Sequence, residues 1–325
     1  MAEAVTIFLT RKKNRLRIPL TEGQKRLSPT QRESTNTKCE EPLMPSEECL
    51  DHAVINVKYE MDKATALFEK LGFSLTPRGY HSHGSINHLM IFGDDYLELI
   101  GIPEKKEIER RDLIHAPIGI NGIVFKANDI EDIQSRLEIA DFHGDPPRAF
   151  SRPVEIDGEN KEAQFRTTTV RPEIFPGGRV YYCEHNTPEL VWRQEWQAHA
   201  NGVTSILELV VVTYNSDHEA GHFATLLNTE VKIDDAGSRY VPLNGSQVTI
   251  LSPEQYSIRY EDLALPMGGR CSIFGSIVFA TNKLNALNGA LSNSNGIATI
   301  QSSERTIAQL GDYNTILEFI GPDFY

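Results

Sequence analysis

The chain carries a duplicated segment, and this repeat constrains the fold more than any other feature of the sequence. The run Leu50–Val57 resembles Ile206–Thr213, which begins 156 positions later. The run Gly122–Asn128 resembles Ser276–Asn282, which begins 154 positions later. Because two separate runs share nearly one offset, the sequence predicts a duplicated unit of about 155 residues.

Each unit contains the same order of elements twice: one strand, one helix and three strands, abbreviated βαβββ. In the first module a helix is expected over residues 61–71, where apolar residues recur on one face and Gly72 supplies a left-handed stop. The inward positions of the four predicted helices match at the repeat offsets: Ala64, Leu67 and Leu71 with Ala220, Phe223 and Leu227, and Ile130, Ile133 and Leu137 with Leu284, Leu287 and Leu291. Strands are expected at residues 52–57, 73–77, 85–92 and 96–100 in module one, and at 122–127, 149–156, 163–170 and 179–192 in module two.

A half-sheet of this kind cannot bury its faces alone, so two modules must pair. The sequence therefore predicts an α+β fold in which four βαβββ modules form two domains, each with a concave mixed sheet and outer helices. We place the first domain at residues 46–200 and the second at 201–325, because Gln197–Gly202 breaks the periodicity. Residues 1–45 are polar and basic without sustained periodicity, so we expect a disordered extension, with Met44 as the natural start.

Composition narrows the range of partners. The net charge of −13 argues against nucleic acid, whose phosphates would repel the protein. No run approaches the roughly 18 apolar residues of a membrane span. The four cysteines show no close pairing and no CxxC, and the basic N-terminal residues are not followed by an apolar signal core. We therefore expect a cytoplasmic protein with reduced thiols.

Two polar side chains are predicted to meet on the concave face of the first sheet. His52 lies opposite Ala53 and Ile55 in the strand alternation, and Glu98 leaves the apolar face of residues 96–100 in the same way. An imidazole and a carboxylate together suit a divalent metal such as Fe, Mn, Ni or Zn. The alternative is structural, with His52 as a hydrogen-bonded core histidine and Glu98 as the partner of an arginine.

Module two offers further site residues. His185 would complete a set of two histidines and one carboxylate, and Glu189 is the candidate general base or fourth ligand. The alternative for His185 is a loop histidine bonded to the backbone. Asn87 and His88 are the candidate substrate-binding residues of module one, one on each face of their strand. Trp192 is expected either at the rim of the substrate pocket or in a domain interface.

The remaining histidine clusters favour structural roles. His81 and His83 are expected in a flexible loop. His218 and His222 have the i, i+4 spacing of a metal-binding pair, but their helix corresponds to an outer packing helix, so a surface pair is expected. The sequence contains no GxxxxGK[ST], no GxGxxG after a strand, no GxSxG and no HExxH, which argues against the enzyme classes that depend on these motifs.

Several segments resemble the vicinal oxygen chelate superfamily, and within it the glyoxalase-like domain proteins: Leu50–Val54, Asn87–Leu99, and Thr187–Trp192 followed by His199–Gly202. The resemblance covers residues 48–321 and implies two glyoxalase/dioxygenase-like domains. It also implies a divalent metal in the concave sheet, chelated by adjacent oxygens of a substrate, with His52 and Glu98 at ligand positions. Members of the superfamily include glyoxalase-type lyases and isomerases, extradiol dioxygenases, and resistance proteins that only bind or modify a drug.

The sequence departs from that family pattern in both units. Residues 120–123 read Ile-Asn-Gly-Ile where many members have a second histidine. In the second unit Glu208 is the counterpart of His52 and Glu318 parallels Glu98, so we expect this unit to have lost its metal and to serve structure. A glyoxalase I reaction on a glutathione adduct is therefore not expected.

The leading functional hypothesis is a metal-dependent glyoxalase/dioxygenase-like enzyme that acts on a small oxygen-chelating substrate, with the metal as a Lewis acid. The second hypothesis is a non-catalytic small-molecule binding or resistance protein that uses the same concave surface. Edge strands of such sheets can pair between chains, which makes a homodimer a further expectation.

Overall fold

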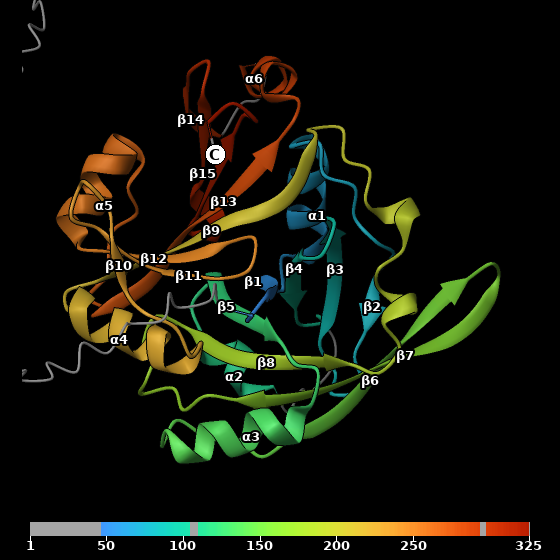
Figure 1. The fold of residues 1–325 in the computed structure, drawn as a ribbon. Coiled ribbons are helices and arrows are strands. Elements are labelled where there is room, and N and C mark those ends of the chain that lie inside the picture. The colour runs from blue at the N-terminus through green and yellow to red at the C-terminus, as the bar shows by residue number, and fades with distance from the viewer. Residues whose placement is uncertain (1–46, 105–109, 293–296, 325) are drawn as a thin grey trace, which may run out of the picture. The chain divides into compact units, whose positions relative to one another are not determined.

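The computed structural model describes residues 47–104, 110–292 and 297–324, and these residues form two eight-stranded mixed sheets with helices (Figure 1). The predicted extension over residues 1–45 lies outside the described residues. No helix in the described ranges has the length and apolar character needed to cross a membrane.

The first sheet contains modules one and two in the predicted order. Module one comprises β1 (Leu50–Lys58), α1 (Met61–Lys70), β2 (Gly79–Tyr80), β3 (Ile86–Ile91) and β4 (Tyr96–Gly101). A short helix, α2 (Arg111–His115), leads to module two. Module two comprises β5 (Gly119–Lys126), α3 (Ile130–Ile139), β6 (Arg148–Ile156), β7 (Glu159–Thr169) and β8 (Arg179–His185). The 3₁₀ helices η1 (Pro188–Leu190) and η2 (Gln194–Trp196) follow.

The second sheet contains modules three and four. Module three comprises β9 (Val203–Thr213), α4 (Ser216–Leu226), β10 (Lys232–Ile233), β11 (Arg239–Pro242) and β12 (Gln247–Leu251). The helices α5 (Pro253–Tyr260) and η3 (Glu261–Leu263) connect the two modules. Module four comprises β13 (Ser272–Thr281), α6 (Leu284–Ser292), β14 (Ala298–Gln301), β15 (Arg305–Leu310), η4 (Gly311–Tyr313) and β16 (Thr315–Ile320).

The two sheets share one strand order, as a duplicated unit requires. The first runs β2-β3-β4-β1-β5-β8-β7-β6, and the second runs β10-β11-β12-β9-β13-β16-β15-β14. In each sheet the first strands of the two modules pair antiparallel at the centre, and each pairs in parallel with the last strand of its own module. The predicted α+β fold of paired βαβββ modules is therefore confirmed.

Some predicted boundaries differ from the structure. Residues 73–77, expected as a strand, lie outside β2, which spans only Gly79–Tyr80. The last strand of module two ends at His185, because Pro188 begins the 3₁₀ helix η1 and lacks the N–H that a strand would need. Helix α5 was not expected, although Ser252 and Gln255 form a capping box before its tyrosines.

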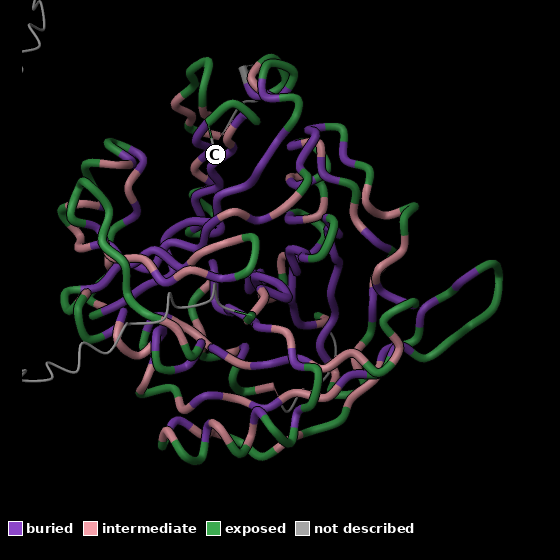
Figure 2. The backbone as a smooth tube through the Cα atoms, in the orientation of Figure 1, coloured by how far each residue is buried: buried purple, intermediate pink, exposed green. Residues whose placement is uncertain are grey.

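Strand alternation separates the helix-facing side of the first sheet from its concave side. Ala53 and Ile55 of β1 belong to a core shared by both sheets, whereas Val54 belongs to a separate cluster on the concave side. Phe73 contacts Phe279 of the second sheet with ring centroids 5.7 Å apart, within the shared core. Figure 2 shows that the central strands of both sheets are buried, whereas the tip of the β6–β7 hairpin is exposed.

The first sheet curls until its two edge regions meet. The backbone N–H of Ser82, just after β2, donates to the carbonyl of Ser151 in β6 at 3.0 Å. In return, the backbone N–H of Ser151 donates to the Ser82 hydroxyl at 3.3 Å. These bonds join the sheet edges into a nearly closed barrel, and the concave side becomes the wall of a cavity.

Candidate functional site

A β-bulge in β1 brings two polar side chains together. The register between β1 and β5 shifts between Leu50 and His52, so Asp51 is an extra residue in the ladder. Strict alternation would direct Asp51 and His52 to opposite faces, but Asp51 Oδ1 lies 2.5 Å from His52 Nδ1. Asp51 Oδ2 lies 3.0 Å from Nε2 of His185 at the end of β8. One buried carboxylate therefore holds two imidazoles.

The Asp51 carboxylate determines the tautomer of His52. Burial alone would raise the pKa of Asp51, but the charge of His185 and the hydrogen bonds from both histidines outweigh it and lower this pKa. An ionised carboxylate only accepts hydrogen bonds, which assigns a proton to His52 Nδ1. The other ring nitrogen, Nε2, then presents its lone pair on the opposite side of the ring.

Glu98 reaches the Nε2 side of His52. It pairs with Val54, two residues beyond His52 in β1, so both side chains lie on the concave face. Glu98 Oε2 lies 3.7 Å from His52 Nε2, and Oε1 accepts a 2.7 Å hydrogen bond from Asn87 Nδ2. His52 and Glu98 are both buried. The imidazole–carboxylate pair predicted from alternation is thus present on the concave side.

This pair lies in the wall of a cavity of about 1140 Å³ within the curled first sheet. The volume is sufficient for a drug-sized or smaller ligand. Beside His52 and Glu98, its lining includes aromatic side chains and several arginines: Tyr96, Phe150, Phe165, Tyr181, Arg110, Arg148, Arg152 and Arg179.

His81 extends the hydrogen-bond network at the cavity wall. Its Nε2 lies 3.2 Å from Asn87 Nδ2, and its Nδ1 lies 2.8 Å from the Ser85 hydroxyl. Burial lowers the pKa of His81 to about 4, with Glu98 opposing this shift and nearby arginines adding to it. The imidazole is therefore neutral at pH 7, accepts from Asn87 and donates to Ser85. The sequence suggested only a flexible loop at this residue, because the partners come from β3 and the loop before it.

Module two supplies no second histidine, because Gly122 occupies the position equivalent to His52. Gly122 is the partner of Val54 across the central β1–β5 pair. A Cβ added at Gly122 would lie 2.9 Å from the Val54 side chain, a distance too short for ordinary packing. The departure seen at residues 120–123 thus has a steric basis in the structure.

Tyr181 occupies the position in module two that corresponds to Glu98. Glu98 pairs with the residue two positions beyond His52, and Tyr181 pairs with Val124, two positions beyond Gly122. The Tyr181 hydroxyl lies 3.5 Å from His52 Nε2. Burial raises the pKa of Tyr181, so its phenol stays protonated. Strand alternation did not single out this residue, since a tyrosine on a predicted strand is more often a packing residue.

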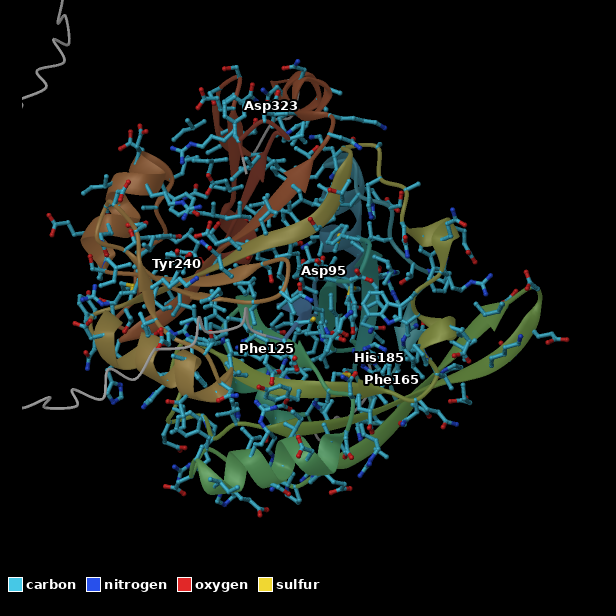
Figure 3. The ribbon with its side chains drawn as sticks, in the orientation of Figure 1. Asp95, Phe125, Phe165, His185, Tyr240 and Asp323 are labelled. Atoms are coloured by element: carbon cyan, nitrogen blue, oxygen red, sulfur yellow. The ribbon has the colours of Figure 1, made fainter. Side chains whose placement is uncertain are left out.

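His185 belongs to the rear of the site. Its Nε2 contacts Asp51, and its ring packs against Phe165 with centroids 5.1 Å apart (Figure 3). His185, Asp51 and Cys183 can bring one ligand atom each within 4.8 Å of one another. His185 therefore contacts Asp51 behind His52 and is not among the residues that line the cavity, whereas the predicted ligand set required it beside His52 and Glu98.

Two other predicted residues lie away from the cavity lining. Glu189 is exposed on η1, where its carboxylate faces solvent. Trp192 packs against His185 and Tyr96, with ring centroids 5.5 and 5.4 Å apart. Both follow Pro188, where the chain leaves the sheet, and neither is among the residues that line the cavity.

Asn87 and His88 are consecutive residues of β3, so their side chains point to opposite faces of the sheet. Asn87 lines the cavity and bonds Glu98. His88 lies on the opposite face of β3, where Nδ1 bonds the Thr76 carbonyl at 2.7 Å and Nε2 accepts from Arg78 at 3.2 Å. Only the first of these two predicted substrate-binding residues lies at the cavity.

The concave face of the second sheet is filled by helix α5. Arg259 of this helix donates bidentate hydrogen bonds of 2.7 and 2.8 Å to Glu208, the counterpart of His52. It also donates to Glu318 at 2.9 and 3.2 Å, and the Tyr260 hydroxyl donates to the same carboxylate at 2.9 Å. Both carboxylates are thus committed to an internal ion-pair network.

The donor set in the first sheet fits a divalent cation. His52 Nε2 and the Glu98 carboxylate converge, and the Tyr181 hydroxyl lies nearby. An imidazole whose far nitrogen is bound by a carboxylate is the usual arrangement of a metal-ligating histidine. Imidazole and carboxylate ligands are suited to Fe, Mn, Ni and Zn, and the cavity beside them leaves room for substrate.

Solved structures resemble the chain across both sheets. A hypothetical protein from Staphylococcus aureus matches with a TM-score of 0.58 and 13% identity, over 84% of this chain and 99% of that one. A mutant 4-hydroxymandelate synthase from Streptomyces coelicolor matches with a TM-score of 0.50 and 12% identity, over 86% and 93% of the two chains. A xylose isomerase-like TIM barrel/4-hydroxyphenylpyruvate dioxygenase fusion protein matches with a TM-score of 0.54 and 11% identity, over 86% of this chain and 50% of that one. At these identities the likeness shows the fold alone.

Sequence comparison identifies the family of the chain. No match was found among curated proteins. The family described as glyoxalase-like domain matches residues 50–227, which is more than half of the chain and includes every strand of the first sheet. The chain therefore belongs to the glyoxalase-like domain family.

Proposed function

We propose that this protein is a metal-dependent glyoxalase/dioxygenase-like enzyme that acts on a small oxygen-chelating substrate in the cavity of the first sheet. The observation that carries this proposal is the Asp51–His52–Glu98 arrangement, in which a fixed imidazole and a carboxylate meet at the cavity wall.

His52 Nε2 and the Glu98 carboxylate would hold the metal, and Asp51 would orient His52 from behind. A bound divalent metal supplies Lewis acidity toward the oxygens of a chelating substrate. Asn87 steadies Glu98 by its hydrogen bond to Oε1, so the second carboxylate oxygen keeps its direction toward His52.

Tyr181 and the aromatic lining surround the proposed metal position and would orient the substrate and the His52 ring. The protonated Tyr181 hydroxyl is a hydrogen-bond donor close to His52, suited to a substrate oxygen. Tyr96 stacks on the His52 ring with centroids 4.2 Å apart and limits its rotation. These residues would orient the imidazole and the substrate.

A binding protein without chemistry is the second candidate. One observation favours it: module two has Gly122 and Tyr181 at the positions equivalent to His52 and Glu98, so only half of the symmetric positions carry strong ligands. Such a protein would bind its ligand in the same cavity, without turnover and without need of a metal.

Metal content measured by plasma mass spectrometry distinguishes the two candidates. The untagged protein would be compared with His52→Ala, Glu98→Ala and the control His222→Ala, whose imidazole bonds the Ile174 carbonyl at 3.1 Å outside the cavity lining. Near-stoichiometric metal in the wild type and the control, lost in the first two variants, supports the enzyme. No metal in the wild type, even after reconstitution, would leave the binding protein.

A further inference from the structure

One arginine in the cavity wall has no partner for its charge. Arg152 of β6 is only 2% exposed and lines the cavity. No carboxylate of the described residues lies within the 4.0 Å of an ion pair, and its Nη2 is buried without a hydrogen bond. Taking a charge out of water is unfavourable unless an opposite charge or hydrogen bonds compensate it.

From this unpaired guanidinium we propose that the cavity recognises its small-molecule ligand by a carboxylate group bound to Arg152. This substrate class rests on the proposed function of the same cavity, and it applies equally to an enzyme and to a binding protein. The planar guanidinium matches a carboxylate with two parallel hydrogen bonds.

The carboxylate that acts on Arg152 at longer range is already engaged. Glu98 contributes favourably to the charged state of Arg152 at longer range, but its carboxylate is bound to Asn87 and directed at His52. Burial lowers the pKa of Arg152, and this lowering dominates over the opposing influence of Tyr96 and Glu98. The protein thus leaves the compensation of this buried cation incomplete.

The space around the guanidinium is created by a glycine. A Cβ on Gly79 of β2 would lie 3.1 Å from Arg152 Cδ, 3.3 Å from its Nη1 and 2.2 Å from Asn87 Oδ1. A side chain at this position would therefore displace both polar groups. Asn87 Oδ1 is also buried without a hydrogen bond. It could therefore accept a hydrogen bond from an N–H or O–H group that lies next to the carboxylate of the ligand.

The second sheet provides an internal comparison. There Arg259 occupies the concave face and pairs with both Glu208 and Glu318. Two other arginines of the first cavity, Arg110 and Arg179, share Asp112 at 2.8 and 3.4 Å. Arg259, Arg110 and Arg179 thus have carboxylate partners, and Arg152 is the exception among these four.

Binding of phenylacetate and its neutral analogue phenylacetamide, measured by calorimetry on the full chain, tests the proposal. The probes match the aromatic lining and differ in charge. We expect phenylacetate to bind about tenfold tighter or more, as charged hydrogen bonds imply. Arg152→Met should remove this preference, and Arg152→Lys should retain part of it. Equal affinities, absence of phenylacetate binding, or an unchanged preference in Arg152→Met would overturn the proposal.

The same measurement on metal-free His52→Ala separates this inference from the metal proposal. Because Arg152 acts through its own charge, the preference for phenylacetate should persist in that variant. Persistence without metal in the wild type would retain the anion site and reject the metal enzyme. If the wild type binds metal but shows no preference for phenylacetate, the metal proposal would stand and the anion site at Arg152 would be rejected.

Discussion

Replacing Arg259 or Arg152 by methionine should have different consequences for stability, because Arg259 has carboxylate partners and Arg152 has none among the described residues. Arg259→Met removes the cation that pairs with Glu208 and Glu318, whose side chains are 11% and 2% exposed. Glu208 would then stay buried without its ion-pair partner, and Glu318 would keep Arg305 at 3.3 Å and the Tyr260 hydroxyl. Breaking a buried ion pair in this way costs roughly 3–5 kcal/mol of unfolding free energy. Methionine retains most of the side-chain volume, so little of the loss comes from packing.

Arg152→Met should change the unfolding free energy by less than about 1 kcal/mol or raise it, because it removes a buried charge without leaving another one unpaired. Urea unfolding followed by circular dichroism at pH 7, without ligand, measures both variants against the wild type. Adding Glu208→Gln to Arg259→Met should recover part of its loss, since Glu208 loses its ion pair with Arg259 whereas Glu318 keeps Arg305 at 3.3 Å.

A loss in Arg152→Met as large as in Arg259→Met would refute the reasoning, because it would mean that Arg152 has an internal partner in the folded protein. A negligible loss in Arg259→Met would show that water compensates the carboxylates of the second sheet.

Three further predictions concern single residues. Asp51→Asn should weaken metal binding about 10–100-fold by removing the charge that orients His52, and an unchanged affinity in a chelator competition would contradict this role. Burial raises the pKa of Asp95 to about 7, although its hydrogen bond from Ile206 N–H opposes the shift (Figure 3). The folded state therefore binds the Asp95 proton more tightly than the unfolded state, so stability should fall as pH rises from about 4 to 7, and Asp95→Asn should flatten this part of the urea-midpoint profile. Gly79→Ala should cost roughly 1–3 kcal/mol because its Cβ collides with Asn87 Oδ1, whereas Gly221→Ala, which meets no atom within 4 Å, should be neutral or stabilising; equal thermal shifts would count against the steric argument.

Local patterns predicted the fold and part of the site. The repeat offsets led to two paired sheets, and alternation in the strands of His52 and Glu98 predicted that both face the concave side. These inferences succeeded because a strand with one polar residue among buried neighbours has only two faces to choose from.

The remaining site residues depend on events that alternation does not encode. The bulge at Asp51 breaks the period of two, which is why the carboxylate behind His52 was missed. Arg152 lies on a strand rich in charged residues, and only the approach of β2 to β6 buries it. The cytoplasmic location, the homodimer and the division into domains at residue 200 stay predictions from sequence.

The core shared by the two sheets has a consequence for how the chain folds. Phe73 and Phe92 of the first half contact Phe279 of the second with ring centroids 5.7 and 5.6 Å apart, so neither half buries its helix-facing side without the other. Unfolding one half exposes apolar surface on its neighbour, and the described chain should melt in a single cooperative transition. The second sheet can thus lose its ligand site and still be retained, because the first sheet needs it as a folding partner.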